Sequence, residues 1–187
     1  MKKYSVSLIL VSLLLLVSAA SAQKPDMAQK LFKKLKVGEW IKVEGIPQKN
    51  FTVLLREIEL IYGEVEDDDW EISGRISTLD PKKKMMYVLN LPVKIDDNIE
   101  YDDDYEIIKS FSDIKPGLFV ELEGTYLKDG TFLGTEIGTA DEKAQRLNKI
   151  EWTGKVQEVD PTTRTITMLG HNFVFTPSTK IKSLIQD

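Results

Sequence analysis

The sequence predicts an all-β protein made of two copies of a small five-stranded barrel, with a short N-terminal helix and a short linker helix. Residues 36–45 (KVGEWIKVEG) match residues 115–124 (KPGLFVELEG), and residues 74–81 (GRISTLDP) match residues 154–161 (GKVQEVDP). Both matches have nearly the same separation along the chain, which indicates an internal repeat. Apolar and polar residues alternate within the matching segments, as in strands with one buried face.

The N-terminus predicts a signal peptide at residues 1–22. Lys2 and Lys3 precede an apolar run at residues 6–17, and Ala20-Ser21-Ala22 forms a small-residue cleavage site. The apolar run has about 12 residues, whereas a membrane span needs about 20. We therefore expect cleavage after Ala22, export to the periplasm or the exterior, and no stable membrane insertion afterwards.

Two short segments predict helices. Residues 26–35 (DMAQKLFKKL) begin with an Asp suited to capping, and Met27, Leu31 and Leu35 fall near one face. Residues 139–149 (TADEKAQRLNK) predict a short helix or polar linker within the second copy.

The predicted strands follow in matching order in the two copies. Strands with period-two alternation run through Ile41 and Val43 in one copy and through Val120 and Leu122 in the other. Turn residues such as Asp80-Pro81 and Asp160-Pro161 separate the later strands. The remaining predicted strands are residues 52–60, 72–76, 85–89 and 93–95, matched by residues 131–137, 152–156, 165–169 and 173–175.

The domain division follows from how these strands are paired. Sequential pairing gives a first β-barrel copy at residues 23–108 and a second at residues 109–187, which is the division we predict. The alternative is a central barrel at residues 70–139, with the outer strands pairing with each other. The repeat does not distinguish the two arrangements.

The turn and strand pattern resembles an exported bacterial family catalogued as domain of unknown function 5666. The similar residues are Gly74-Arg75-Ile76 through Asp80, residues 117–124 and residues 132–137, with a second opening half at residues 154–181. The resemblance implies an oligonucleotide-binding-like small β-barrel. It implies no catalytic residue and no cofactor.

Composition disfavours several functions. The net charge of −5 disfavours nucleic acid as a partner, because phosphate backbones bind clustered Lys and Arg. The chain has no Cys and one His, His171, in a Gly170-His171-Asn172 turn where we expect it to be exposed. Nucleophilic catalysis needs a nucleophile beside a base, and no motif supplies one. We expect no enzyme activity and no cofactor.

Two aromatic residues occupy matching positions. Trp40 and Phe119 begin the matching strands, on the face opposite the apolar alternation. They could form a weak binding surface or bury an interface between the copies. Lys42 in one copy becomes Glu121 in the other, which removes the positive charge that nucleic-acid stacking sites use.

Acidic residues cluster between residues 96 and 106. Calcium takes six to eight oxygen ligands, and the candidate ligands are Asp96, Asp97, Glu100, Asp102, Asp103 and Asp104. The segment has no glycine to turn a ligand loop, and charged runs often serve as solvated protection of strand edges. Both interpretations stay open.

These observations predict a non-catalytic, exported binding or scaffolding protein of the bacterial cell envelope. Its partner would be an envelope protein or a small ligand. The alternative is a calcium-binding envelope protein that uses the acidic segment.

Overall fold

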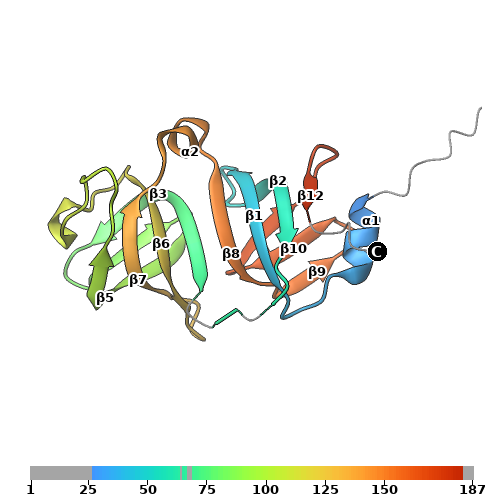
Figure 1. The fold of residues 1–187 in the computed structure, drawn as a ribbon, viewed down its shortest axis with the longest axis horizontal. Coiled ribbons are helices and arrows are strands. Elements are labelled where there is room, and N and C mark those ends of the chain that lie inside the picture. The colour runs from blue at the N-terminus through green and yellow to red at the C-terminus, as the bar shows by residue number, and fades with distance from the viewer. Residues whose placement is uncertain (1–26, 64, 67–68, 183–187) are drawn as a thin grey trace, which may run out of the picture.

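The computed structural model of the chain describes residues 27–63, 65–66 and 69–182, so the predicted signal peptide lies outside the described residues. The fold is all-β with few helices (Figure 1). Helix α1 (Met27–Lys34) and helix α2 (Glu142–Leu147) confirm the two predicted helices, and a single 3₁₀ turn, η1, spans Phe111–Asp113. Among the described residues, no helix combines the length and apolarity needed to span a bilayer.

Five strands close into a barrel, which we call the central barrel. Its ladders run β3–β4, β4–β5, β5–β7, β7–β6 and β6–β3, so each strand has two neighbours and no edge remains. This confirms a small five-stranded barrel. The strands are β3 (Trp70–Asp80), β4 (Met85–Val88), β5 (Leu91–Tyr101), β6 (Phe119–Tyr126) and β7 (Phe132–Thr139).

The remaining strands form what we call the outer sheet, on the right in Figure 1. The order is β8–β1–β2–β11–β10–β9, and β12 pairs with β2 beside β11. Its strands are β1 (Trp40–Pro47), β2 (Val53–Leu60), β8 (Ile150–Lys155), β9 (Glu158–Asp160), β10 (Thr165–Met168), β11 (His171–Val174) and β12 (Lys180–Lys182).

The strand ladders correct the predicted domain division. β1 and β2 pair with strands that follow residue 150, while β3, β4 and β5 pair with β6 and β7. Barrels at residues 23–108 and 109–187 therefore do not form. The hydrogen bonds instead follow the alternative arrangement, a central barrel within residues 70–139 flanked by strands from both ends of the chain.

A short joint connects the central barrel to the outer sheet. Strands β3 and β8 pair only at Glu71 with Thr153 and Ile72 with Trp152. The Ser73 hydroxyl then extends the joint, because it donates to the Glu151 carbonyl (3.0 Å) and accepts from the Glu151 N–H (2.7 Å). The buried Trp152 indole N–H donates to the Ser73 carbonyl at 2.7 Å. The joint therefore leaves no backbone group of Glu151 unpaired where the ladder ends.

Alternating burial places the apolar residues on the inner faces. In β1, for example, Ile41 and Val43 are buried while Lys42 and Glu44 are half-buried. Helix α1 closes one end of the outer sheet, where Phe32 packs edge-on against Phe175 with ring centroids 4.9 Å apart. The helix buries Leu31 and Phe32 and leaves its basic residues exposed.

Candidate functional site

Trp40 lies in an aromatic stack between the outer sheet and the central barrel. Its ring centroid is 4.9 Å from that of Trp70, and Trp70 is 5.5 Å from Tyr126. Lys155 places its ammonium 5.1 Å from the Trp40 ring centroid. Such tilted stacks are favoured by the ring quadrupoles. Trp40 therefore packs at the seam between the two parts rather than on an open platform.

Phe119 has a similar partner in the central barrel. It is 1% exposed, and the Arg75 guanidinium carbon lies 5.5 Å from its ring centroid. The matching position therefore has a matching cation–π pair, and the buried Phe119 presents no ring face for stacking a base. The structure does not combine the two rings into one surface.

Two of the candidate calcium ligands on β5, Asp96 and Asp97, have hydrogen-bond partners. The Lys84 ammonium donates to Asp97 at 2.7 Å, and this hydrogen bond and the lysine charge lower the pKa of Asp97 below 3.8. Asp96 accepts from the Asn98 N–H at 2.8 Å. Glu100 pairs in register with Glu136 of β7.

Asp103 organises the loop that follows β5. Its carboxylate accepts from the N–H groups of Ile107 (2.8 Å) and Ile108 (2.6 Å) and from the Thr139 hydroxyl (2.9 Å). The Tyr105 and Thr139 N–H groups add longer bonds. Burial raises the pKa of Asp103, but these hydrogen bonds outweigh burial and lower it below 3.8. The carboxylate is therefore fully used in holding the loop against β7.

Asp102 and Asp104 face a shallow hollow on the central barrel. This hollow, about 200 Å³, is also lined by Glu71, Glu121, Glu123 and Glu136. Burial and the charges of Glu123, Asp102 and Glu100 raise the pKa of Glu136. Within the described part of the chain, no group of three or more His, Cys, Asp and Glu side chains is arranged to hold a metal ion.

A network of charges crosses the β3–β8 joint. Lys42 lies 2.6 Å from Glu151 and 3.4 Å from Glu71. Burial lowers the pKa of Lys42, but the hydrogen bond and charge of Glu151, together with Glu71, outweigh burial and raise it. Burial and the charges of Glu71 and Glu151 raise the pKa of Glu121. Glu121, at the position equivalent to Lys42, is thus the like-charged member of this network.

His171 is buried, so the prediction of an exposed turn histidine is wrong. It is 8% exposed and lies edge-on to Trp152, with centroids 5.0 Å apart. Nδ1 lies 2.9 Å from the Leu169 carbonyl oxygen, and Nε2 lies 2.5 Å from the Leu89 carbonyl oxygen in the β4–β5 turn. The histidine therefore links the outer sheet to the central barrel.

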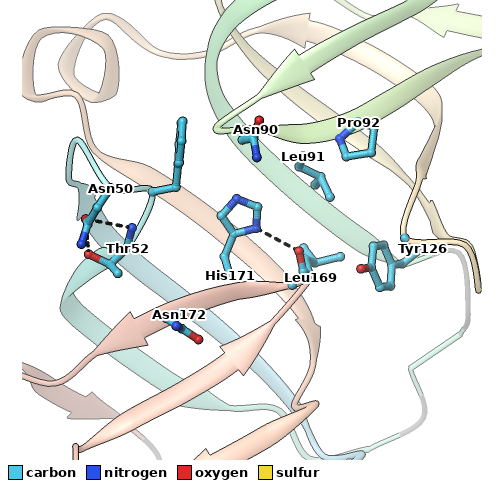
Figure 2. Close-up of a pocket in the computed structure, with 12 residues that line it drawn as sticks. Asn50, Thr52, Asn90, Leu91, Pro92, Tyr126, Leu169, His171 and Asn172 are labelled. Carbon is cyan, nitrogen blue, oxygen red and sulfur yellow. Dashed lines mark hydrogen bonds between the residues drawn. The ribbon is translucent and has the colours of Figure 1, made fainter.

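A cleft opens beside His171 where four hairpin turns meet (Figure 2). We call it the junction cleft; its volume is about 280 Å³. The turns come from both parts of the molecule: β1–β2 and β10–β11 of the outer sheet, and β4–β5 and β6–β7 of the central barrel. The lining residues are Asn50, Phe51, Thr52, Asn90, Leu91, Pro92, Tyr126, Gly130, Leu169, Gly170, His171 and Asn172.

No local sequence pattern predicts this cleft. Its residues stand in four separate turns, and their only local signals are turn residues such as Asn50, Asn90 and Gly170. The repeat offered one usable signal: the Leu89-Asn90 and Leu169-Gly170 turns occupy equivalent positions. Because the strand pairing was open, nothing indicated that both turns face one space.

The comparison with known families identifies part of the chain. Residues 73–138 match the family described as Domain of unknown function (DUF5666), which confirms the resemblance over this segment. The matched segment lies within β3 to β7, the closed central barrel. No curated protein and no solved structure matches the chain.

Proposed function

We propose that this chain, with its DUF5666 segment at residues 73–138, is a non-catalytic exported binding protein of the bacterial cell envelope. The one observation that carries the proposal is the placement of His171. As the only histidine of the chain, with Cys absent, it is the natural candidate for a base near neutral pH. Both of its nitrogens lie against backbone carbonyl oxygens, which supports a structural role.

We further propose that the outer sheet is a second copy of the barrel. The β-bulges support this, since the register shifts at Glu44/Gly45 in β1 and at Glu123/Gly124 in β6. The hairpins agree as well: the Ile95 N–H donates to the Lys84 carbonyl, and the Phe175 N–H donates to the Arg164 carbonyl, both at 2.9 Å. On this proposal the acidic β5 extension and β12 are diverged versions of one strand.

The export part of the proposal rests on residues 1–22. Their basic start, apolar run and Ala20-Ser21-Ala22 site support cleavage after Ala22. Expression of the full chain in a bacterial host, followed by osmotic-shock fractionation and mass spectrometry, tests this directly. We expect a released protein whose N-terminus is Gln23. A cytoplasmic protein that keeps Met1 would contradict export.

The binding part is tested by capture from an envelope extract. The purified mature protein is immobilised, and retained envelope proteins and glycans are identified against a bead carrying the heat-unfolded chain. We expect at least one component retained only by the folded protein. If the folded and unfolded beads retain the same components, the binding proposal fails.

The calcium alternative stays a prediction without structural support. Its candidate ligands Asp97 and Asp103 are committed to Lys84 and to the loop N–H groups. Calorimetric titration of the mature protein with millimolar calcium tests calcium binding. A saturable heat of binding would support the calcium alternative.

A further inference from the structure

We propose that the junction cleft binds the pyranose ring of an uncharged saccharide. This inference rests on the proposed binding function and names the site and the ligand class. Four features of the cleft support it: its preformed walls, its unused polar groups, its lack of charged side chains and its exposed apolar surface.

The walls of the cleft are fixed by turn geometry. Phe51, Asn90 and Leu169 line it with φ angles of 63°, 71° and 53°. Left-handed backbone costs about 1 kcal/mol or more at a non-glycine residue, and such residues gather where a binding surface must be held in shape. The bond from His171 to the Leu89 carbonyl fixes the β10–β11 turn against the β4–β5 turn. A ligand therefore meets walls that need little ordering.

Polar groups around the cleft have unused hydrogen-bonding capacity. Among the described residues, the Asn90 amide and the Tyr126 hydroxyl have no hydrogen-bond partner. Asn50 uses its side-chain oxygen for Thr52, so its NH₂ group remains available as a donor. Amide and hydroxyl groups of this kind pair with neighbouring sugar hydroxyls.

The lack of charged side chains in the cleft lining disfavours ionic ligands. The lining contains no Lys, Arg, Asp or Glu side chain, although the chain has 25 basic and 30 acidic residues. A charged ligand that entered would lose hydration without gaining a counter-charge, which costs several kcal/mol. The ligand class is therefore uncharged and rich in hydroxyl or amide groups.

Apolar surface in the cleft suits the C–H face of a sugar. Phe51, which lines the cleft, is 48% exposed. The half-buried Pro92 and Tyr126 add apolar surface (Figure 2). The volume of about 280 Å³ lies just below the range of about 300 to 1,000 Å³ that is typical of small-ligand pockets. One ring with a small substituent fits that size, and a pyranose combines C–H faces with a rim of hydroxyls.

Nuclear magnetic resonance titration of the mature chain tests this site. The probes are methyl glucoside, methyl galactoside, methyl mannoside and N-acetylglucosamine, with cationic glucosamine and anionic glucuronate as charged comparators. We expect at least one neutral sugar to give saturable amide shifts at Thr52, Asn90, Gly130 and Gly170, and the charged sugars to bind about tenfold more weakly or not at all. The proposal would be overturned if no neutral sugar gave saturable shifts or if the saturable shifts lay outside the cleft. A charged sugar that bound as tightly as the neutral sugars would also overturn it.

Variants that preserve the fold sharpen the test. Phe51→Gly and Asn90→Gly remove a cleft side chain at a positive φ that glycine adopts readily, so both should fold. Asn148→Gly is the matched control, since Asn148 also has a positive φ (48°) but caps α2 outside the cleft. We expect F51G and N90G each to weaken sugar binding about tenfold and N148G to leave it unchanged. Equal binding by all three would overturn the proposal.

The saccharide proposal can fail independently of the proposed binding function. If no sugar binds but the envelope extract still yields a component retained only by folded protein, the saccharide inference fails and the binding function stands. If an uncharged peptide bound the cleft and no sugar did, the saccharide class would be wrong.

Discussion

His171 shows how one residue serves two parts of the molecule. It lies edge-on to Trp152 and bridges turns that belong to the outer sheet and the central barrel. We expect His171→Ala to lower the free energy of unfolding by about 2 to 4 kcal/mol, because it opens a cavity beside Trp152 and removes the ring that lies against the Leu89 and Leu169 carbonyls. Urea denaturation measures this, with Asn172→Ala, an exposed neighbour, as control. Equal losses for the two variants would contradict a structural role.

Asp103 gives a pH-dependent prediction at the same scale. Its folded-state pKa is lowered, so its stabilisation is present above the unfolded pKa near 4 and is lost as the pH falls through the folded value. We expect Asp103→Asn to cost about 1 to 3 kcal/mol at neutral pH and less as the pH drops below about 4. Asp104→Asn, at an exposed neighbour, should cost little at any pH. A cost for D103N that does not change with pH would refute this assignment.

Glu121 is predicted to change the stability of the protein with pH in the direction opposite to Asp103. Its pKa is raised, so the folded state binds the proton more tightly and stability declines as the pH rises above the unfolded value near 4.3. We therefore expect Glu121→Gln to stabilise the protein at pH 7 by a few tenths to about 1 kcal/mol, since the side chain is partly screened by solvent. The gain should vanish near pH 4. Glu158→Gln, on an exposed edge strand, is the control. Destabilisation by E121Q at pH 7 would contradict the electrostatic account.

Single-residue environments were the least predictable part of the sequence. Flanking Gly170 and Asn172 suggested an exposed turn at His171, yet the carbonyl of Leu89, distant in sequence, comes from the other part of the molecule and buries it. The sequence predicts that the strand before the acidic segment ends at Ile95, whereas β5 continues to Tyr101 and carries Asp96, Asp97 and Glu100. The partners of Asp97 and Asp103 depend on contacts that no local pattern reveals.

At the scale of elements, the glycine at the bulge of each repeated strand, β1 and β6, has a steric role. A Cβ on Gly124 would overlap the Leu133 carbonyl oxygen across the β6–β7 bulge. Gly134→Ala is a matched control, because its Cβ would lie 3.1 Å from the flexible end of Leu122. We expect Gly124→Ala to cost about 2 to 4 kcal/mol and G134A less than about 1, by chemical denaturation. Similar costs for both would show that the bulge tolerates a side chain.

Elements were more predictable than their pairing. Period-two alternation and turn residues predicted most of the observed strands, because each signal is local. These patterns missed the short strands β9 and β12, and they ended β5 at Ile95 rather than at Tyr101. These local patterns could not distinguish sequential barrels from a central barrel, because Ile41 and Val120 point inward in both arrangements. The choice depends on contacts such as that of Trp152 with Ser73, which join segments distant in sequence.

At the scale of the whole molecule, the central barrel and the outer sheet form one structural unit with the junction cleft at their seam. The Trp40–Trp70–Tyr126 stack, the Ser73–Glu151–Trp152 joint and the His171 bridge all cross that seam. A cleft built from turns of both parts keeps its shape only if they do not separate.

Differential scanning calorimetry of the mature chain is the most direct test of this claim. We expect one transition whose calorimetric enthalpy equals its van't Hoff enthalpy, because loss of either part exposes the buried seam of the other. Two resolved transitions, or a calorimetric enthalpy well above the van't Hoff value, would show that the parts unfold independently and would contradict the account.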